Sequence, residues 1–180
     1  MFKKSKNYVN FSERAKGFTI LEVVIAIFFL TIGIGAAFGV IQKILNFSSI
    51  NNSRLIAANL SQEGIEIVKN IRDTNYIEGK IWDDEIGGEI GESKDYEADY
   101  NDGNLSDYNG EYLKIDAVNG FYNYDAGANT KFKRKIIISE KTDLDGDEQA
   151  DRMKITVITE WDEKSGTNSF EACEYLYDWK

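Results

Sequence analysis

The hydrophobic pattern of the chain begins with an apolar run from Phe18 to Ile41, in which Glu22 is the one charged residue. As an α-helix rising about 1.5 Å per residue, this run would extend roughly 36 Å. That length is enough to cross a hydrocarbon core of about 30 Å. The pattern therefore predicts a transmembrane helix over residues 18–41.

Beyond Ile41 the pattern stays helical but becomes amphipathic. Small and apolar residues recur three and four positions apart, with polar residues between them, which is the spacing of one helix face. The residues of this stripe are Ala57, Leu60, Gly64, Ile67 and Ile71. The stripe predicts that the same helix continues over residues 42–72, with a break around Asp73 to Asn75.

The rest of the chain changes to loop and strand patterns. Residues 73–130 are rich in Gly, Asn, Asp and Tyr, which predicts an irregular region, with short strands at 111–116 and 121–125. Their tyrosines suit either a face that stacks on sugars or packing over a sheet edge. Residues 131–180 contain β-branched runs that predict antiparallel strands.

Two of these runs, Phe132 to Ser139 and Arg152 to Trp161, are joined by an acidic loop and predict a hairpin, with a third strand near Ser169 to Trp179. One face of the second run would cover the helix; its residues are Met153, Ile155, Val157, Thr159 and Trp161. The predicted fold is α+β: a long N-terminal helix, with a transmembrane half and an amphipathic half, packed on a small antiparallel sheet.

Charge is distributed unevenly along the chain. Residues 1–17 carry five basic side chains and one acidic one, whereas the whole chain has a net charge of −10. A basic head before an apolar run predicts that the head stays in the cytoplasm, so the acidic domain would lie outside it. Nucleic acid is not an expected partner, because phosphate binding needs a basic excess. The basic cluster Lys131, Lys133, Arg134 and Lys135 is instead expected to pair with neighbouring carboxylates.

The composition also limits catalysis. Histidine is absent and Cys173 is the single cysteine, which excludes a triad containing histidine, a CxxC pair and a thiolate zinc cluster. No enzyme activity is expected. Cys173 itself is interpreted as a small apolar residue in a strand.

The position of Glu22 requires an explanation, because a carboxylate in a membrane span is costly and is usually functional. A secretory signal with a cleavage site near Gly35 would have a shorter apolar core. A plain signal anchor explains the length of the run but not the acid. A glutamate that extends to the membrane interface remains an alternative.

The stretch KGFTILEVVIAI, Lys16 to Ile27, resembles the cleavage and methylation signature of type IV prepilins and type II secretion pseudopilins. The resemblance covers about the first third of the chain. It implies that a prepilin peptidase removes the basic leader, residues 1–17, by cutting after Gly17, and then methylates the amine of Phe18. It also implies that the apolar helix remains in the membrane and later forms the core of a filament.

Within this resemblance Glu22 acquires a role in assembly. After cleavage, the Phe18 amine and Glu22 would share one helix face near the positive end of the dipole. The family implies that the glutamate meets the amino terminus of a neighbouring subunit. The chain lacks proline and a C-terminal cysteine pair, so it is more similar to minor pilins or pseudopilins than to major pilins.

The expected partners are therefore the prepilin peptidase, other pilin or pseudopilin subunits, and membrane lipid. The expected location is the cytoplasmic membrane, with an extracytoplasmic C-terminal domain that becomes part of a surface or periplasmic filament. The alternative is a bitopic membrane protein that presents a ligand-binding domain without assembling. Gly35 and Gly39 form a GxxxG pair that suits close helix packing, although glycines also weaken a helix.

The loop between the two longest predicted strands is a calcium candidate. Asp143, Asp145, Asp147 and Asp151 alternate so that several carboxylates can turn toward one point, and hard oxygen ligands suit calcium. The alternative is a hairpin tip with an Asp-Gly turn, whose acids keep an exposed edge soluble. No other cofactor is expected.

Overall fold

The computed structural model describes residues 17–163 and 166–179, which fall into two compact units. The first unit is Met1–Asn46. The second, Phe47–Lys180, is called the body below. Helix α1, Ile20–Glu78, contributes residues to both units. Apart from Gly17, the predicted basic leader lies outside the described residues.

In the first unit, α1 is helical from Ile20 onward, and every described side chain up to Asn46 is exposed. The helix is continuous through Gly33, Gly35 and Gly39. By length and composition α1 could cross a membrane. This result supports a membrane anchor or a signal segment, of which the sequence predicted the anchor.

The predicted break at Asp73 to Asn75 is wrong, because α1 continues to Glu78. Gly79, with a φ of 73°, ends the helix. Its N–H donates to the carbonyl of Tyr76 at 3.2 Å, and Lys80 N–H donates to that of Asn75 at 2.9 Å, the hydrogen-bond pattern of a Schellman motif. The buried Asn75 amide also donates to the Trp82 carbonyl at 3.2 Å, so this residue holds the following loop rather than ending the helix.

The body contains two antiparallel sheets. The larger has five strands in the order β2-β1-β6-β7-β8, and the smaller has three in the order β4-β3-β5. The strands of the larger sheet are β1 Lys94–Glu97, β2 Ser106–Asp107, β6 Phe132–Thr142, β7 Arg152–Glu163 and β8 Gly166–Tyr177. Those of the smaller sheet are β3 Lys114–Ile115, β4 Tyr122–Asn123 and β5 Ala128–Asn129.

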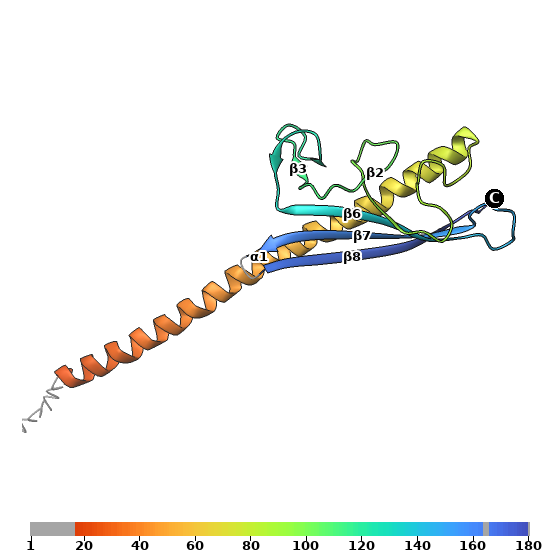
Figure 1. Ribbon diagram of the computed structural model, residues 1–180. Helices are drawn as coiled ribbons and strands as arrows, with labels where there is room; N and C mark the ends of the chain where they lie inside the picture. Colours follow the sequence, from red (N-terminus) through yellow and green to blue (C-terminus); the bar gives the residue numbers. More distant parts are fainter. Residues whose placement is uncertain (1–16, 164–165, 180) are drawn as a thin grey trace, which may run out of the picture. The chain divides into compact units, whose positions relative to one another are not determined.

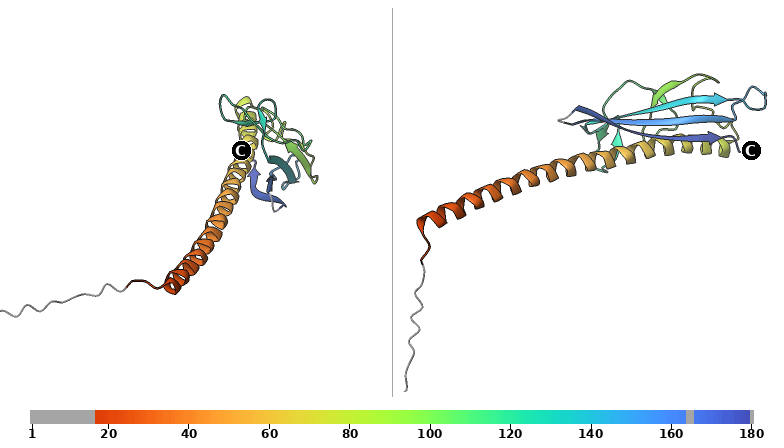
Figure 2. Two further views of the ribbon diagram at one scale, coloured as in Figure 1. Left: turned by 90° about the vertical axis from the view of Figure 1, so that its left-hand side faces the viewer. Right: turned by 90° about the horizontal axis from the view of Figure 1, so that it is seen from below.

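Within the body, α1 lies along one face of the larger sheet (Figures 1 and 2). The predicted helix stripe is buried. The predicted inward face of β7 is buried as well, with Met153, Ile155 and Val157 fully enclosed. The α+β fold predicted from the sequence is therefore confirmed.

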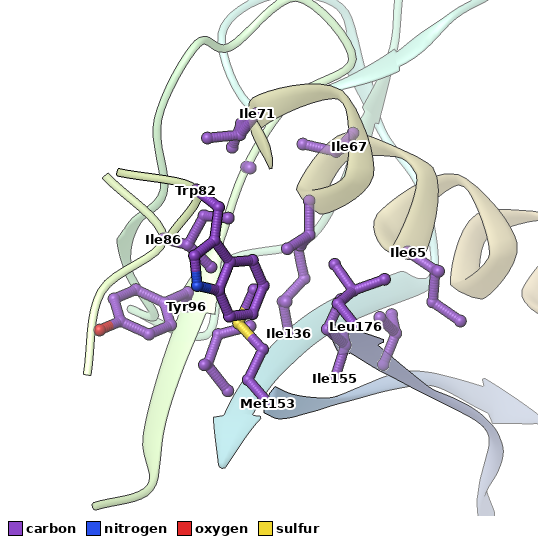
Figure 3. Packing of buried hydrophobic residues seen from close by; sticks show 14 of the residues in the cluster. Ile65, Ile67, Ile71, Trp82, Ile86, Tyr96, Ile136, Met153, Ile155 and Leu176 are labelled. Carbon is purple, nitrogen blue, oxygen red and sulfur yellow. The ribbon is translucent and has the colours of Figure 1, made fainter. Parts of the chain in front are cut away.

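A loop after α1 closes one end of the core. Figure 3 shows apolar side chains of the helix and the sheet gathered around the Trp82 indole. Trp82 Nε1 donates to the carbonyl of Ala150 at 2.5 Å. Ile86 on the same loop is fully buried. The loop is thus part of the hydrophobic core and does not simply run over the surface.

The C-terminal residues are held on the last turns of α1. The Tyr76 hydroxyl donates to Asp178 Oδ1 at 2.8 Å, and the Tyr76 and Trp179 rings lie 4.9 Å apart in an edge-on arrangement. The Arg72 guanidinium lies 6.0 Å from the centre of the Trp179 ring. These contacts join the end of the helix to the end of the last strand.

Candidate functional site

The predicted processing junction lies just before α1. Gly17, Phe18 and Thr19 are not helical, and the Phe18 side chain is 80% exposed. A Cβ atom on Gly17 would have no other group within 4 Å. The bond between Gly17 and Phe18 therefore lies in an irregular, accessible segment, where proteolytic cleavage is favoured.

Glu22 lies in the first turn of α1, where Thr19 caps the helix. The Glu22 N–H donates to Oγ1 of Thr19 at 3.3 Å. A carboxylate in this turn is favoured by the positive end of the helix dipole. Phe18 precedes α1 in the uncleaved chain, because the helix begins at Ile20; the helix face that Phe18 would share with Glu22 after cleavage stays a prediction.

Thr19 is a residue that the sequence interpretation missed. Its place three residues before a glutamate is the spacing of a capping box, and this signal was available in the sequence. The cap fixes where α1 starts, because the Thr19 carbonyl also accepts the N–H of Val23 at 3.2 Å. Cleavage after Gly17 would leave Phe18 as a single residue before the cap.

The GxxxG glycines, Gly35 and Gly39, lie on the exposed part of α1. A Cβ atom at either position would meet nothing within 4 Å. The described chain therefore places no group against them. Their role in close helix packing stays a prediction about contacts between copies.

The loop between β6 and β7 brings three of the four predicted calcium ligands together. Asp143, Asp145 and Asp151 each offer an oxygen within 4.8 Å of the others. Asp147 is not in this group, and its Oδ1 accepts the N–H of Gln149 at 2.9 Å. Three carboxylates are a donor set that calcium prefers, so calcium stays a prediction for this loop.

The same loop also satisfies its carboxylates with backbone donors. Asp143 accepts the N–H groups of Gly146 at 2.6 Å, Glu148 at 3.0 Å and Asp145 at 3.1 Å. These hydrogen bonds, that from Gly146 first, lower the pKa of Asp143. The loop can therefore hold its shape as a hairpin tip, and both alternatives from the sequence remain open.

The basic cluster on β6 and just before it is largely paired with carboxylates, as expected. Lys135 Nζ lies 3.0 Å from Asp95, and Arg134 Nη1 lies 3.2 Å from Glu63. Lys131 pairs with Glu163. Lys133 instead lies 4.4 Å from the centre of the Tyr112 ring. These partners neutralise most of the cluster.

Lys131, Glu163 and Ser53 form a small network between β7 and α1. Lys131 Nζ and the Ser53 hydroxyl are 2.8 Å apart, and Ser53 Oγ is 2.8 Å from Glu163 Oε1. A serine beside a lysine can form a nucleophile and base pair. Here the hydrogen bonds from Lys131 and then Ser53 lower the pKa of Glu163. The Lys131 ammonium donates hydrogen bonds to both Glu163 and Ser53. The network therefore ties the helix to the sheet and is not read as a catalytic pair.

Part of the tyrosine-rich region packs inside the body and part of it stays exposed, so the packing role is seen and sugar stacking stays a prediction. Tyr96 is buried in the core, and the Tyr124 hydroxyl donates to the Arg134 carbonyl at 3.0 Å. Tyr100 and Phe121 remain 44% and 54% exposed. Cys173 lies in β8, as expected for a strand residue, but its side chain is exposed.

Comparison with known proteins gives no relative: no family model, no curated protein and no solved structure matches the chain. The structure itself shows a long N-terminal helix with an apolar first part, whose later part packs on an antiparallel sheet. This arrangement is consistent with a pilin-like fold.

Proposed function

We propose that the protein is a structural subunit of a type IV pilus or a type II secretion-like filament. The observation that carries this proposal is helix α1, which combines an exposed apolar half with a half packed on a sheet. The sequence KGFTILEVVIAI around its start supports the same assignment. In this function the apolar half anchors the stored subunit in lipid and later packs against other copies.

The proposed route begins with a precursor in the cytoplasmic membrane, with its body outside the cytoplasm. A prepilin peptidase cuts after Gly17 and methylates the Phe18 amine. Glu22, alone in an apolar surface, then recruits the positive amino terminus of a neighbouring subunit, because an unpaired charge in lipid is costly. The protein works by assembly, and no enzymatic activity is proposed.

The subunit is proposed to be a minor pilin or a pseudopilin. The chain has no proline in the apolar part of α1 and only one cysteine. The apolar part of the helix is also continuous through Gly33, Gly35 and Gly39. These features support a short or specialised filament component over a major pilin.

The decisive experiment is intact-mass and N-terminal analysis of the protein extracted from membranes. The expected chain begins at Phe18 and carries one methyl group on its amine. Gly17→Leu should trap the precursor, because a bulky side chain blocks the cleavage junction. Gly33→Leu is the matched control and should be processed normally.

A chain that still begins at Met1, or one that begins at Phe38, would contradict the pilin assignment. The first result would support a bitopic protein that presents a ligand-binding domain without assembly. A surface cavity in the body, described below, favours this as the second candidate. A chain that begins at Phe38 would instead indicate an ordinary secretory signal.

A further inference from the structure

A cavity of about 210 Å³ opens on the body between α1 and the smaller sheet. It is smaller than most pockets for complete small molecules, which measure about 300–1,000 Å³. The cavity suits one chemical group and not an extended ligand. Its lining residues, called the aromatic pocket, are Glu63, Tyr100, Gly120, Phe121 and Tyr122.

Three of the five lining residues are aromatic. The Tyr100 and Phe121 rings have centroids 5.0 Å apart and are tilted by 57°, so they form two adjoining walls. Tyr122 is anchored in the core by an edge-on contact with Phe132, with ring centroids 6.3 Å apart. Tyr100 and Phe121 leave about half of their surfaces in water, so a ligand can reach both rings.

The fourth side chain of the pocket is a carboxylate in a fixed position. Arg134, which is fully buried, donates from Nη1 toward Glu63 Oε1 at 3.2 Å. Arg134 is itself held by the carbonyls of Leu60 at 3.3 Å and Ala98 at 2.6 Å. Arg134 therefore fixes the orientation of Glu63 from the buried side, while the Glu63 side chain stays 35% exposed to solvent.

The charge of the pocket limits its ligand. Burial, and then the negative charge of Glu63, raise the pKa of Tyr122, so the carboxylate acts on the cavity wall. Arg134 pairs with Glu63 from the buried side, but an anion in the pocket would still face the exposed side of this carboxylate and a chain of net charge −10. A cation gains from both the carboxylate and the negative faces of the rings.

The number of hydrogen-bond acceptors in the aromatic pocket decides between a primary ammonium and a quaternary ammonium as its ligand. A primary ammonium brings three N–H donors that each need an acceptor. The one carboxylate in the pocket already shares an oxygen with Arg134. A quaternary ammonium has no N–H donors to satisfy, and its charge is spread over methyl groups that pack on aromatic faces.

We propose that the aromatic pocket binds a quaternary ammonium group, through the rings of Tyr100, Phe121 and Tyr122 and the carboxylate of Glu63. The proposal goes beyond filament assembly and does not depend on it. The group can belong to a choline headgroup or to a trimethylated lysine side chain, which share this chemistry.

The test is calorimetric titration of the full chain in detergent with choline and with 3,3-dimethylbutan-1-ol, its neutral isostere. Choline should bind about tenfold tighter, because only the cation gains from the rings and the carboxylate. Phe121→Leu, which keeps an apolar side chain without the ring, should remove most of this preference. Glu63→Gln should weaken choline binding and leave the isostere unchanged.

Tyr112→Ala is the matched control, because Tyr112 is an exposed tyrosine that stacks on Lys133 outside the pocket. It should bind choline as the unmodified protein does. Since Phe121 is half exposed, its variant is expected to fold, and circular dichroism checks this. Equal affinity for choline and the isostere, or choline binding that Phe121→Leu leaves intact, would overturn the proposal.

Two further ligands identify the source of the group. Phosphocholine represents a headgroup, and trimethyl-lysine amide represents a peptide side chain; binding of either with the Phe121 dependence supports the proposal. Tighter binding of unmethylated lysine amide or of a neutral monosaccharide would overturn it. The N-terminal analysis of the membrane protein is independent, so failure of the pocket and failure of the filament assignment are distinguishable.

Discussion

A Cβ atom on Gly64 of α1 would lie 2.8 Å from one γ-methyl carbon of Val157 on β7 and 3.2 Å from the other. The helix thus approaches the sheet so closely at this point that a side chain on the helix has no room. Val157 is fully buried and sits in a strand, so its branched side chain has little freedom to move away.

Gly64→Ala should therefore lower the free energy of unfolding of the body. Alanine gains roughly 1 kcal/mol in helix propensity, but overpacking a core costs about 1–3 kcal/mol. We expect the cost to exceed the gain, as a lower urea midpoint of the full chain in detergent. Gln62→Ala, on the exposed side of the same turn, should not lower it. Adding Val157→Ala to the Gly64 variant should cost less than Val157→Ala alone.

Arg134→Met should destabilise the body by at least about 2 kcal/mol. The guanidinium donates to the carbonyls of Leu60 and Ala98, and a buried group left without its partner costs about 1–3 kcal/mol. Urea unfolding measures the change. Lys133→Met, the neighbouring residue on the opposite face of β6, should cost no more than about 1 kcal/mol for its lost contact with Tyr112.

The stability of the body should fall as pH rises above the ordinary range of carboxyl groups. Burial raises the pKa values of Glu97 and Asp99. A carboxyl group with a raised pKa binds its proton more tightly in the folded state, so its contribution is present below its unfolded pKa and is lost as pH rises through the folded pKa.

The measurement is the free energy of unfolding between about pH 4 and pH 8. The variant Glu97→Gln should flatten the decline over this range. Glu92→Gln, at an exposed carboxyl group that does not act on Glu97 or Asp99, serves as the control and should keep the slope. An unchanged slope in the Glu97 variant would show that another group causes the decline.

Millimolar calcium should raise the melting temperature of the body if the acidic loop binds it. Asp145→Asn should abolish the rise, because Asp145 belongs to the three-carboxylate group. Asp147→Asn should preserve it, because Asp147 lies outside that group. A protein whose melting temperature ignores calcium would leave the loop as a hairpin tip.

Glu22→Ala should leave the protein stable in the membrane while its incorporation into filaments falls sharply. Removing a carboxylate from an apolar surface favours insertion but takes away the proposed partner of the neighbouring amino terminus. Sheared surface fractions measure incorporation, and membrane fractions measure storage. Equal incorporation of variant and unmodified protein would contradict the assembly role and favour a glutamate that only extends to the membrane interface.

The sequence predicted the elements whose own pattern defines them. The stripe on α1 and the inward face of β7 have regular periods, and both are buried as predicted. The strands predicted at 111–116 and 121–125 are present but are only two residues long, as β3 and β4. Strands β1, β2 and β5 escaped prediction, because such short strands form through their partners and carry little pattern.

The candidate sites divide in the same way. Glu22 was identifiable because its charge interrupts an apolar run. The aromatic pocket was not, because Glu63 and Phe121 are far apart in sequence and meet only through the fold. The end of α1 was also missed, since the role of Asn75 depends on a carbonyl of Trp82, seven residues later.

The tie between Tyr76 and Asp178 has a consequence for biosynthesis. The helix is translated before the strands that cover its stripe and before residues 178–179, which contact its last turns. Such non-local contacts give a high contact order, which slows folding. The stripe on α1 therefore stays uncovered until β6, β7 and β8 have been translated, so the apolar face of the body must remain unaggregated for the time that their synthesis takes.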